Sequence, residues 1–83
     1  MRLLVCDDDP AVGKLLRSIY TVEGWQIDVV TSGRACIAMV ADALPDVIVL
    51  DHMMPELTGI ETARLLRQEG YTKPIVLFSA YLG

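Results

Sequence analysis

The run Val47-Ile48-Val49-Leu50 is apolar at every position and is followed directly by an acid, Asp51. A short continuous apolar run of this kind is typical of a strand that is buried on both faces of a parallel sheet. A second run, Leu3–Cys6, is followed by three consecutive acids, residues 7–9. Ligands of open parallel sheets bind outside the carboxyl ends of the strands. The two runs therefore predict a single acidic site at that edge of a sheet.

The rest of the chain alternates between helical and strand patterns. Apolar residues recur at helical spacing after three capping or turn signals, Asp9-Pro10, Ser32 and Thr58-Gly59. The alternation predicts an α/β fold with a parallel sheet and right-handed crossovers. The expected strands are Leu3–Cys6, Trp25–Thr31, Val47–Leu50 and Ile75–Phe78, and the expected helices run from Pro10 to a C-cap at Gly24, from Gly33 to about Ala43, and from Gly59 to Gly70.

Length and composition indicate one small domain, residues 1–83, with more apolar surface than it can bury alone. Hydrophobic residues make up 53% of the chain and the mean hydropathy is +0.43. The net charge of −4 argues against a nucleic-acid surface, because no basic block could neutralise phosphates. No apolar stretch approaches the ~20 residues of a membrane span, and no signal peptide precedes the first run. We therefore expect a cytoplasmic protein with no membrane partner.

Cys6 and Cys36 both lie in apolar surroundings in the sequence. Their spacing fits no zinc pattern, and two cysteines do not make a disulfide framework. Free cysteine often packs as a small hydrophobic residue. We expect two reduced, buried thiols.

The acids gain a chemical meaning if the first and third strands are neighbours in the sheet. Asp7, Asp8 and Asp51 would then repel one another, and at least one pKa should rise unless a cation intervenes. Mg²⁺ would resolve the repulsion, since it takes one or two carboxylates together with water and phosphate oxygens. We assign Asp9 to helix capping, which explains it fully. Ser79 follows the fourth strand, where its hydroxyl could donate to a phosphate oxygen.

Three segments in this order and spacing resemble the receiver domain of two-component response regulators. They are Leu4-Val5-Cys6-Asp7-Asp8-Asp9-Pro10, then Pro45 to Pro55 with Gly59, then Lys73-Pro74-Ile75-Val76-Leu77-Phe78-Ser79-Ala80. The resemblance implies a flavodoxin-like, doubly wound sheet with strand order 2-1-3-4. It covers essentially the whole chain.

The resemblance also implies a function and a set of site residues. Asp51 would be the phosphoacceptor, receiving a phosphoryl group from a sensor histidine kinase, and Ser79 the switch hydroxyl. Mg²⁺ would be held by Asp8, Asp51 and the backbone carbonyl of Met53, with Asp7 assisting. The domain would be a signalling module and not a free-standing enzyme.

The sequence departs from the family pattern after Ser79-Ala80. We expect an incomplete fold that lacks the last strand and last two helices, and with them the lysine that pairs with the phosphoryl group. The fourth strand would then be an open edge and one sheet face would be half covered. This predicts a homo-oligomer formed through the open surfaces. It also keeps a second interpretation open, a self-association or partner-binding module that is not competent for phosphorylation.

Two other classes of protein fit the sequence less well. A haloacid-dehalogenase-type phosphatase needs Asp-x-Asp-x-Thr/Val after its first strand, but Ala11 stands where Thr or Val should be. A dinucleotide-binding domain needs a glycine-rich loop there, and none follows.

Overall fold

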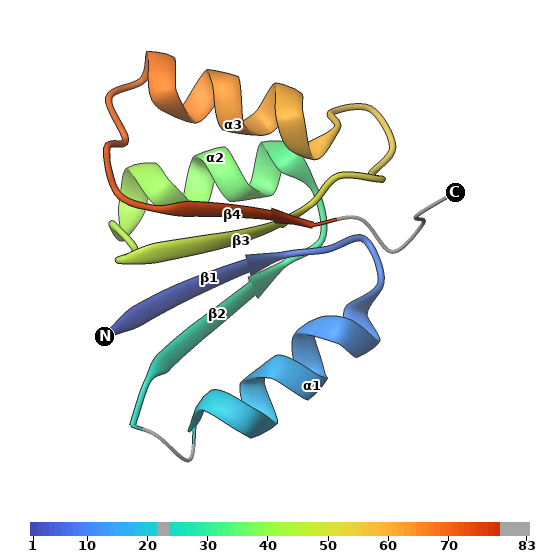
Figure 1. Ribbon diagram of the computed structural model, residues 1–83, viewed down its shortest axis with the longest axis vertical. Helices are drawn as coiled ribbons and strands as arrows, with labels where there is room; N and C mark the ends of the chain where they lie inside the picture. Colours follow the sequence, from blue (N-terminus) through green and yellow to red (C-terminus); the bar gives the residue numbers. More distant parts are fainter. Residues whose placement is uncertain (22–23, 79–83) are drawn as a thin grey trace.

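A computed structural model describes residues 1–21 and 24–78. The described part contains four strands and three helices that alternate along the chain (Figure 1). The elements are β1 Arg2–Cys6, α1 Pro10–Thr21, β2 Gln26–Val30, α2 Gly33–Asp42, β3 Val47–Asp51, α3 Gly59–Gln68 and β4 Ile75–Phe78. Every expected element is present, with ends that differ by at most a few residues. No helix in the described ranges is long and apolar enough to cross a bilayer.

The four strands form one parallel sheet in the order β2-β1-β3-β4. This order confirms the one expected from the family resemblance. Val5 on β1 lies beside Val29 on one neighbour and Val49 on the other. Figure 1 shows α1 on one face of the sheet and α2 with α3 on the opposite face. The strand order makes β1 and β3 adjacent, which is the condition for a shared acidic site.

The face beneath α2 and α3 carries the larger part of the core. Alternate residues of β1 and β3 point into it and are almost completely buried; they are Leu4, Cys6, Ile48 and Leu50. Cys36 from α2 and Leu66 from α3 close this cluster from above. The buried Tyr71 adds a polar link, because its hydroxyl donates to the backbone oxygen of Pro45 at 3.1 Å. These contacts anchor β1 and β3 side by side.

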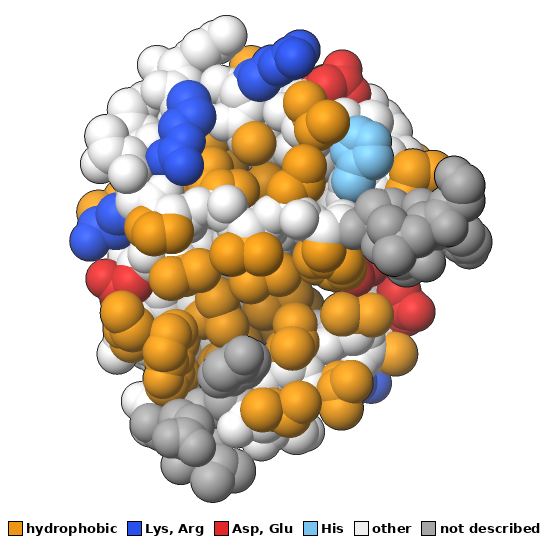
Figure 2. All heavy atoms as spheres, in the orientation of Figure 1, with side chains coloured by type: hydrophobic (Ala, Val, Ile, Leu, Met, Phe, Trp, Pro, Cys, Tyr) orange, Lys and Arg blue, Asp and Glu red, His pale blue; other side chains and the backbone are white. Residues whose placement is uncertain are grey.

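The described residues cover the opposite face only partly. Leu3, Val5 and Ile27 are buried there, and beside them lies a groove of about 300 Å³ that we call the apolar groove. Its lining residues are Leu3, Leu16, Trp25, Val47, Val49 and Val76. Figure 2 shows hydrophobic side chains gathered in a hollow between the sheet and α1. The expectation of uncovered apolar surface agrees with this groove.

Helical spacing alone does not decide which apolar residues are buried. Leu15 and Ile19 recur at the same spacing as Leu16, yet 61% and 52% of their surfaces are exposed. The reason is that α1 packs mainly against β2, so only a narrow stripe of the helix meets the sheet. Ile60 and Leu65 on α3 are likewise exposed at 40% and 36%.

Capping explains where the helices begin. The Ser32 side chain accepts from the backbone N–H of Ala35, as expected for the start of α2. Thr58 and Glu61 form a reciprocal capping box at the start of α3. The Asp9 carboxylate accepts from the Ala11 N–H at 3.0 Å, which agrees with its assigned role before α1.

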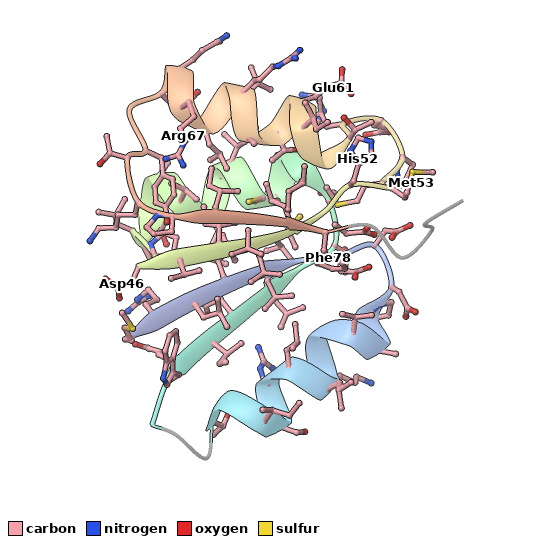
Figure 3. The ribbon with its side chains drawn as sticks, viewed as in Figure 1. Asp46, His52, Met53, Glu61, Arg67 and Phe78 are labelled. Atoms are coloured by element: carbon pink, nitrogen blue, oxygen red, sulfur yellow. The ribbon has the colours of Figure 1, made fainter. Side chains whose placement is uncertain are left out.

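A cluster of polar contacts lies at the amino-terminal ends of the strands, away from the acids. The Asp46 carboxylate accepts from the Arg2 backbone N–H at 2.7 Å and lies 3.5 Å from the Lys73 ammonium. The hydrogen bond from Arg2 and the nearby charge of Lys73 lower the pKa of Asp46, the hydrogen bond most of all. Burial acts in the opposite direction. Figure 3 places Asp46 at this edge and Met53 and Phe78 at the other. Lys73 therefore lies at the end of the sheet opposite the acidic site, where it pairs with Asp46.

Gly59 provides a test of how tightly α3 packs against the end of β3. An added Cβ would lie 2.5 Å from the backbone oxygen of Asp51 and 2.8 Å from the Cα of His52. We expect Gly59→Ala to lower the free energy of unfolding by about 1–3 kcal/mol, because backbone atoms must shift. Urea denaturation measures the change, with Ala41→Ser on the exposed side of α2 as the control. Equal midpoints for Gly59→Ala and the wild-type chain would contradict this packing.

Candidate functional site

The acids that follow β1 and β3 are brought together by the strand register. Cys6 lies opposite Leu50 in the parallel β1–β3 pair, so Asp7 comes directly after one partner and Asp51 directly after the other. Asp8 continues the turn that leads toward α1. The prediction that three acids from two separate segments share one edge of the sheet is confirmed.

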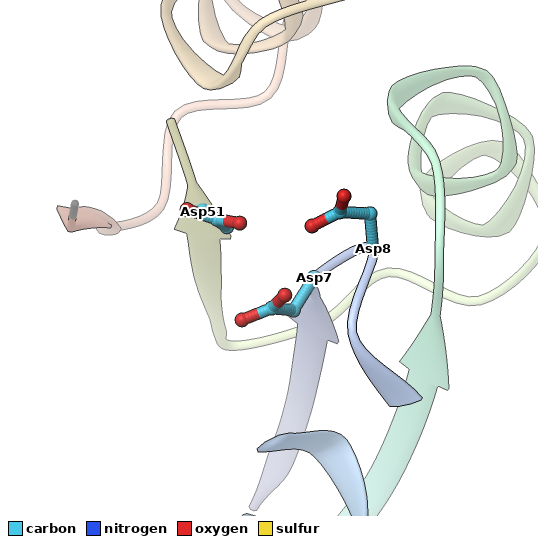
Figure 4. Close-up of side chains that lie close together, drawn as sticks. All are labelled: Asp7, Asp8 and Asp51. Atoms are coloured by element: carbon cyan, nitrogen blue, oxygen red, sulfur yellow. The ribbon is translucent and has the colours of Figure 1, made fainter. Parts of the chain in front are cut away.

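The three carboxylates face a common space (Figure 4). Asp7, Asp8 and Asp51 each offer an oxygen, and these oxygens lie within 4.8 Å of one another. Asp7 and Asp51 are only 3% and 6% exposed, whereas Asp8 is exposed. Two buried negative charges and one at the rim therefore meet at one point.

Backbone amides hold the two buried carboxylates in place. The N–H of Asp9 donates to Asp7 Oδ1 at 2.9 Å, and the N–H of Met53 donates to Asp51 Oδ1 at 3.2 Å. Each donor lies two residues after its acceptor, so each acid is fixed by the first turn of its own loop. The loop after β3 is also fixed at His52, whose backbone oxygen accepts from the N–H groups of Met54 and Gly59.

The electrostatics of the cluster favour a bound cation. Burial raises the pKa of Asp7, and the negative charges of Asp51 and Asp8 raise it further, while the hydrogen bond from the Asp9 amide opposes them. A divalent cation among the oxygens would remove this penalty. The donor set consists of hard carboxylate oxygens, which suit Mg²⁺ or Ca²⁺ better than a soft metal. Asp7, Asp8 and Asp51 thus fit the ion that the sequence led us to expect.

The acids open into a pocket of about 290 Å³. It is lined by Asp7, Asp8, Asp9, Val12, Asp51, Met53 and Phe78. The lining contains no lysine or arginine among the residues that the structure describes. The pocket is strongly negative and has space for a small group. An anionic group could bind there only together with a cation.

The residues named from the sequence can now be placed. Met53 lines the pocket. This position is required if its backbone carbonyl is to contact a metal there. Ser79 lies outside the described residues. Asp9 caps α1, as expected, and also borders the pocket. Sequence reasoning missed Val12 and Phe78 as lining residues, although Phe78 could have been found as the last residue of the strand beside Asp51.

A profile described as the response regulator receiver domain matches residues 3–82 of the chain. Among curated proteins, the response regulator MprA of Mycolicibacterium vanbaalenii is 40% identical over 80 residues. MprA of Mycobacterium avium is 41% identical over the same length. Both alignments cover 96% of this chain and 35% of the relative, so the chain spans about a third of these proteins.

Solved structures show the same fold. The BeF₃-activated receiver domain of RstA from Klebsiella pneumoniae superposes with a TM-score of 0.91 at 28% identity, covering 100% of this chain and 70% of that one. The response regulator TrrA from Thermotoga maritima, solved in complex with Mg²⁺–BeF, gives a TM-score of 0.89 at 32% identity. That alignment covers 98% of this chain and 70% of TrrA.

The raised pKa of Asp7 predicts how stability responds to removal of its charge. In EDTA at pH 7, we expect Asp7→Asn to raise the free energy of unfolding by about 1 kcal/mol, because a buried repulsive charge is lost. The gain should shrink as the pH falls through the raised pKa, since the wild-type carboxyl then becomes neutral as well.

Urea denaturation of both chains across this pH range, with and without Mg²⁺, measures the effect. Saturating Mg²⁺ should reverse the order of stability, because the variant loses a ligand. A variant that is less stable than wild type in EDTA would show that the acids do not repel.

Proposed function

The chain belongs to the response regulator receiver domain family, and we propose that it accepts a phosphoryl group on Asp51 from a sensor histidine kinase. The observation that carries the proposal is the position of Asp51. It is buried at the end of a central strand, it lines the acidic pocket, and its carboxylate lies beside those of Asp7 and Asp8. The proposal includes a cytoplasmic location, which is typical of receiver domains, and the role of a signalling domain that turns over no substrate of its own.

The proposed reaction transfers one phosphoryl group between two side chains. An Asp51 carboxylate oxygen attacks the phosphorus of a phosphohistidine, so that a P–O bond forms while the P–N bond breaks. The electron pair of the broken bond returns to the imidazole of the kinase, which leaves. Such a transfer depends mainly on positioning and on neutralising charge.

The chain's own residues would supply the positioning. The Met53 N–H holds Asp51 Oδ1 at 3.2 Å, which limits rotation of the attacking carboxylate. Asp8, Asp51 and the Met53 carbonyl would hold Mg²⁺, with Asp7 assisting. The bound ion would offset charge on the phosphoryl oxygens. This support matters here because the described pocket lining provides no basic side chain for that task.

The product would place new negative charge where the β3–α3 loop begins. That loop, residues 52–58, is tied to Asp51 through the Met53 amide and to α3 through the bond from Gly59 N–H to His52 O. A phosphoryl group on Asp51 competes for the same amide and adds acceptor oxygens. We propose that this loop is the part that responds first.

Phosphorylation can be tested with a small-molecule donor. We expect incubation with acetyl phosphate and Mg²⁺ to add the mass of one phosphoryl group to the chain, and hydroxylamine to remove it. Asp51→Asn should abolish the gain, because an amide cannot attack. Asp42→Asn, the same change at an exposed position in α2, should leave it intact.

Intact-mass spectrometry provides the readout for all three chains. Omission of Mg²⁺ should abolish labelling of the wild type. Labelling that persists in Asp51→Asn, or that is absent from a folded wild-type chain which binds Mg²⁺, would refute the proposal.

The apolar groove favours a second candidate, a module that associates with a second copy of itself. Val76 and Leu77 on β4 are 50% and 42% exposed. In the described sheet, β4 pairs on one side only, with β3. An apolar strand with an unpaired edge is prone to pair with another chain. Self-association by itself does not exclude phosphorylation, because the groove and the acidic pocket lie at different parts of the sheet.

Self-association can be measured by sedimentation equilibrium at micromolar concentrations. We expect the wild-type chain to form dimers or larger species. Val76→Lys should weaken association by at least about tenfold, since a charge would have to be buried in the contact. Lys14→Ala, a change at an exposed position on α1, is the control. A folded wild-type monomer would overturn this second candidate.

A further inference from the structure

Two cysteines, used by neither proposed activity, lie together in the core. Cys6 is the last residue of β1, and Cys36 is in the first turn of α2. Both are free thiols, both are 0% exposed, and both belong to the cluster beneath α2 and α3.

One backbone oxygen fixes how close the two residues are. The oxygen of Ser32 accepts from the backbone N–H of Cys36 at 3.0 Å and from the Cys6 thiol at 3.2 Å. The Cys6 side chain and the Cys36 backbone are therefore hydrogen-bonded to the same oxygen atom. The neighbouring Cys6 thiol lowers the pKa of Cys36, although burial opposes this shift.

We propose that Cys6 and Cys36 form a redox-active dithiol that a peroxide converts into an intramolecular disulfide. Cys36 is the attacking residue, because the first turn of a helix stabilises a thiolate. Its thiolate sulfur forms an S–O bond to the terminal OH of the peroxide as the O–O bond breaks, and the remaining alkoxide or hydroxide takes up a proton and leaves as an alcohol or water. The Cys6 thiol then displaces that oxygen from the sulfenic acid, with loss of water and formation of the S–S bond.

The loop after β3 contacts the buried pair at Cys6. Met54 covers Cys6, with its sulfur 3.5 Å from the thiol, and is itself 6% exposed. The same loop holds Glu56 at a φ of 67°, in the left-handed region that a side chain disfavours. Local opening of a loop costs less than global unfolding. Opening at Met54 admits a molecule as small as hydrogen peroxide.

The position of the dithiol links it to the acidic site. Cys6 directly precedes Asp7, and a bond from Cys6 to α2 restrains the strand end that carries this acid. Oxidation is therefore expected to weaken Mg²⁺ binding. This consequence rests on the proposed metal site, whereas formation of the disulfide does not.

Mass spectrometry of the folded chain after treatment with hydrogen peroxide tests the disulfide. Remaining thiols are alkylated in denaturant, and methionine oxidation is counted separately by peptide mapping. We expect a species lighter by about 2 Da that resists alkylation, contains a Cys6–Cys36 cross-linked peptide and is reversed by dithiothreitol. Cys6→Ala and Cys36→Ala should each lack it, and Met54→Ala should form it faster.

The peptide map of the wild-type chain decides the matter even if a cysteine variant fails to fold. Two alkylatable thiols after methionines have been oxidised, or disulfides between chains only, would overturn the proposal. Calorimetric titration with Mg²⁺ tests the link to the site. Equal affinity of oxidised and reduced chains refutes the link, whereas failure of the reduced chain to bind Mg²⁺ contradicts the proposed metal site instead.

Discussion

Mutual repulsion among three carboxylates is the constraint on which the other features of this structure depend. Asp7 and Asp51 are buried at adjacent strand ends, and Asp8 lies at the rim within 4.8 Å of both through its nearest oxygen. A hydrophobic core alone would not favour this arrangement, because each buried charge loses hydration. The parallel pairing of β1 and β3 imposes it. The fold thus holds a cluster that only a cation, a proton or a bound group can relieve.

The surrounding structure offsets the repulsion with rigid backbone. Amides of the two following loops donate to the buried acids, and Gly59 lets α3 begin close against the Asp51 carbonyl. The well-packed cluster between the sheet and the helices α2 and α3 fixes the positions of both strands. A change of charge at Asp51 would therefore act on a loop that is anchored at both ends, next to a sheet that is held rigid by its core. Stiffness on one side and a tethered loop on the other suit a site that converts added charge into movement.

The two faces of the sheet are used differently. The face under α2 and α3 is closed, and it holds the two thiols, whereas the face under α1 leaves an apolar groove. Self-association is tied to the open face, and redox chemistry to the closed one. Both faces meet at β1, whose last residue, Cys6, is followed directly by Asp7. This strand end therefore connects the proposed phosphorylation site with the proposed redox chemistry.

The sequence by itself determined the elements and the identity of the acids. Continuous apolar runs, capping residues and glycines act locally, so β3, α2 and the start of α3 could be located without coordinates. The gathering of Asp7, Asp8 and Asp51 followed from sequence only through the expected strand order. Tertiary structure alone decided which helical residues are buried: Leu15 and Leu16 are alike in sequence, but α1 meets the sheet along a narrow stripe. It also decided that Cys6 and Cys36 meet, because contacts between distant segments depend on how α2 packs across β1 and not on either local pattern.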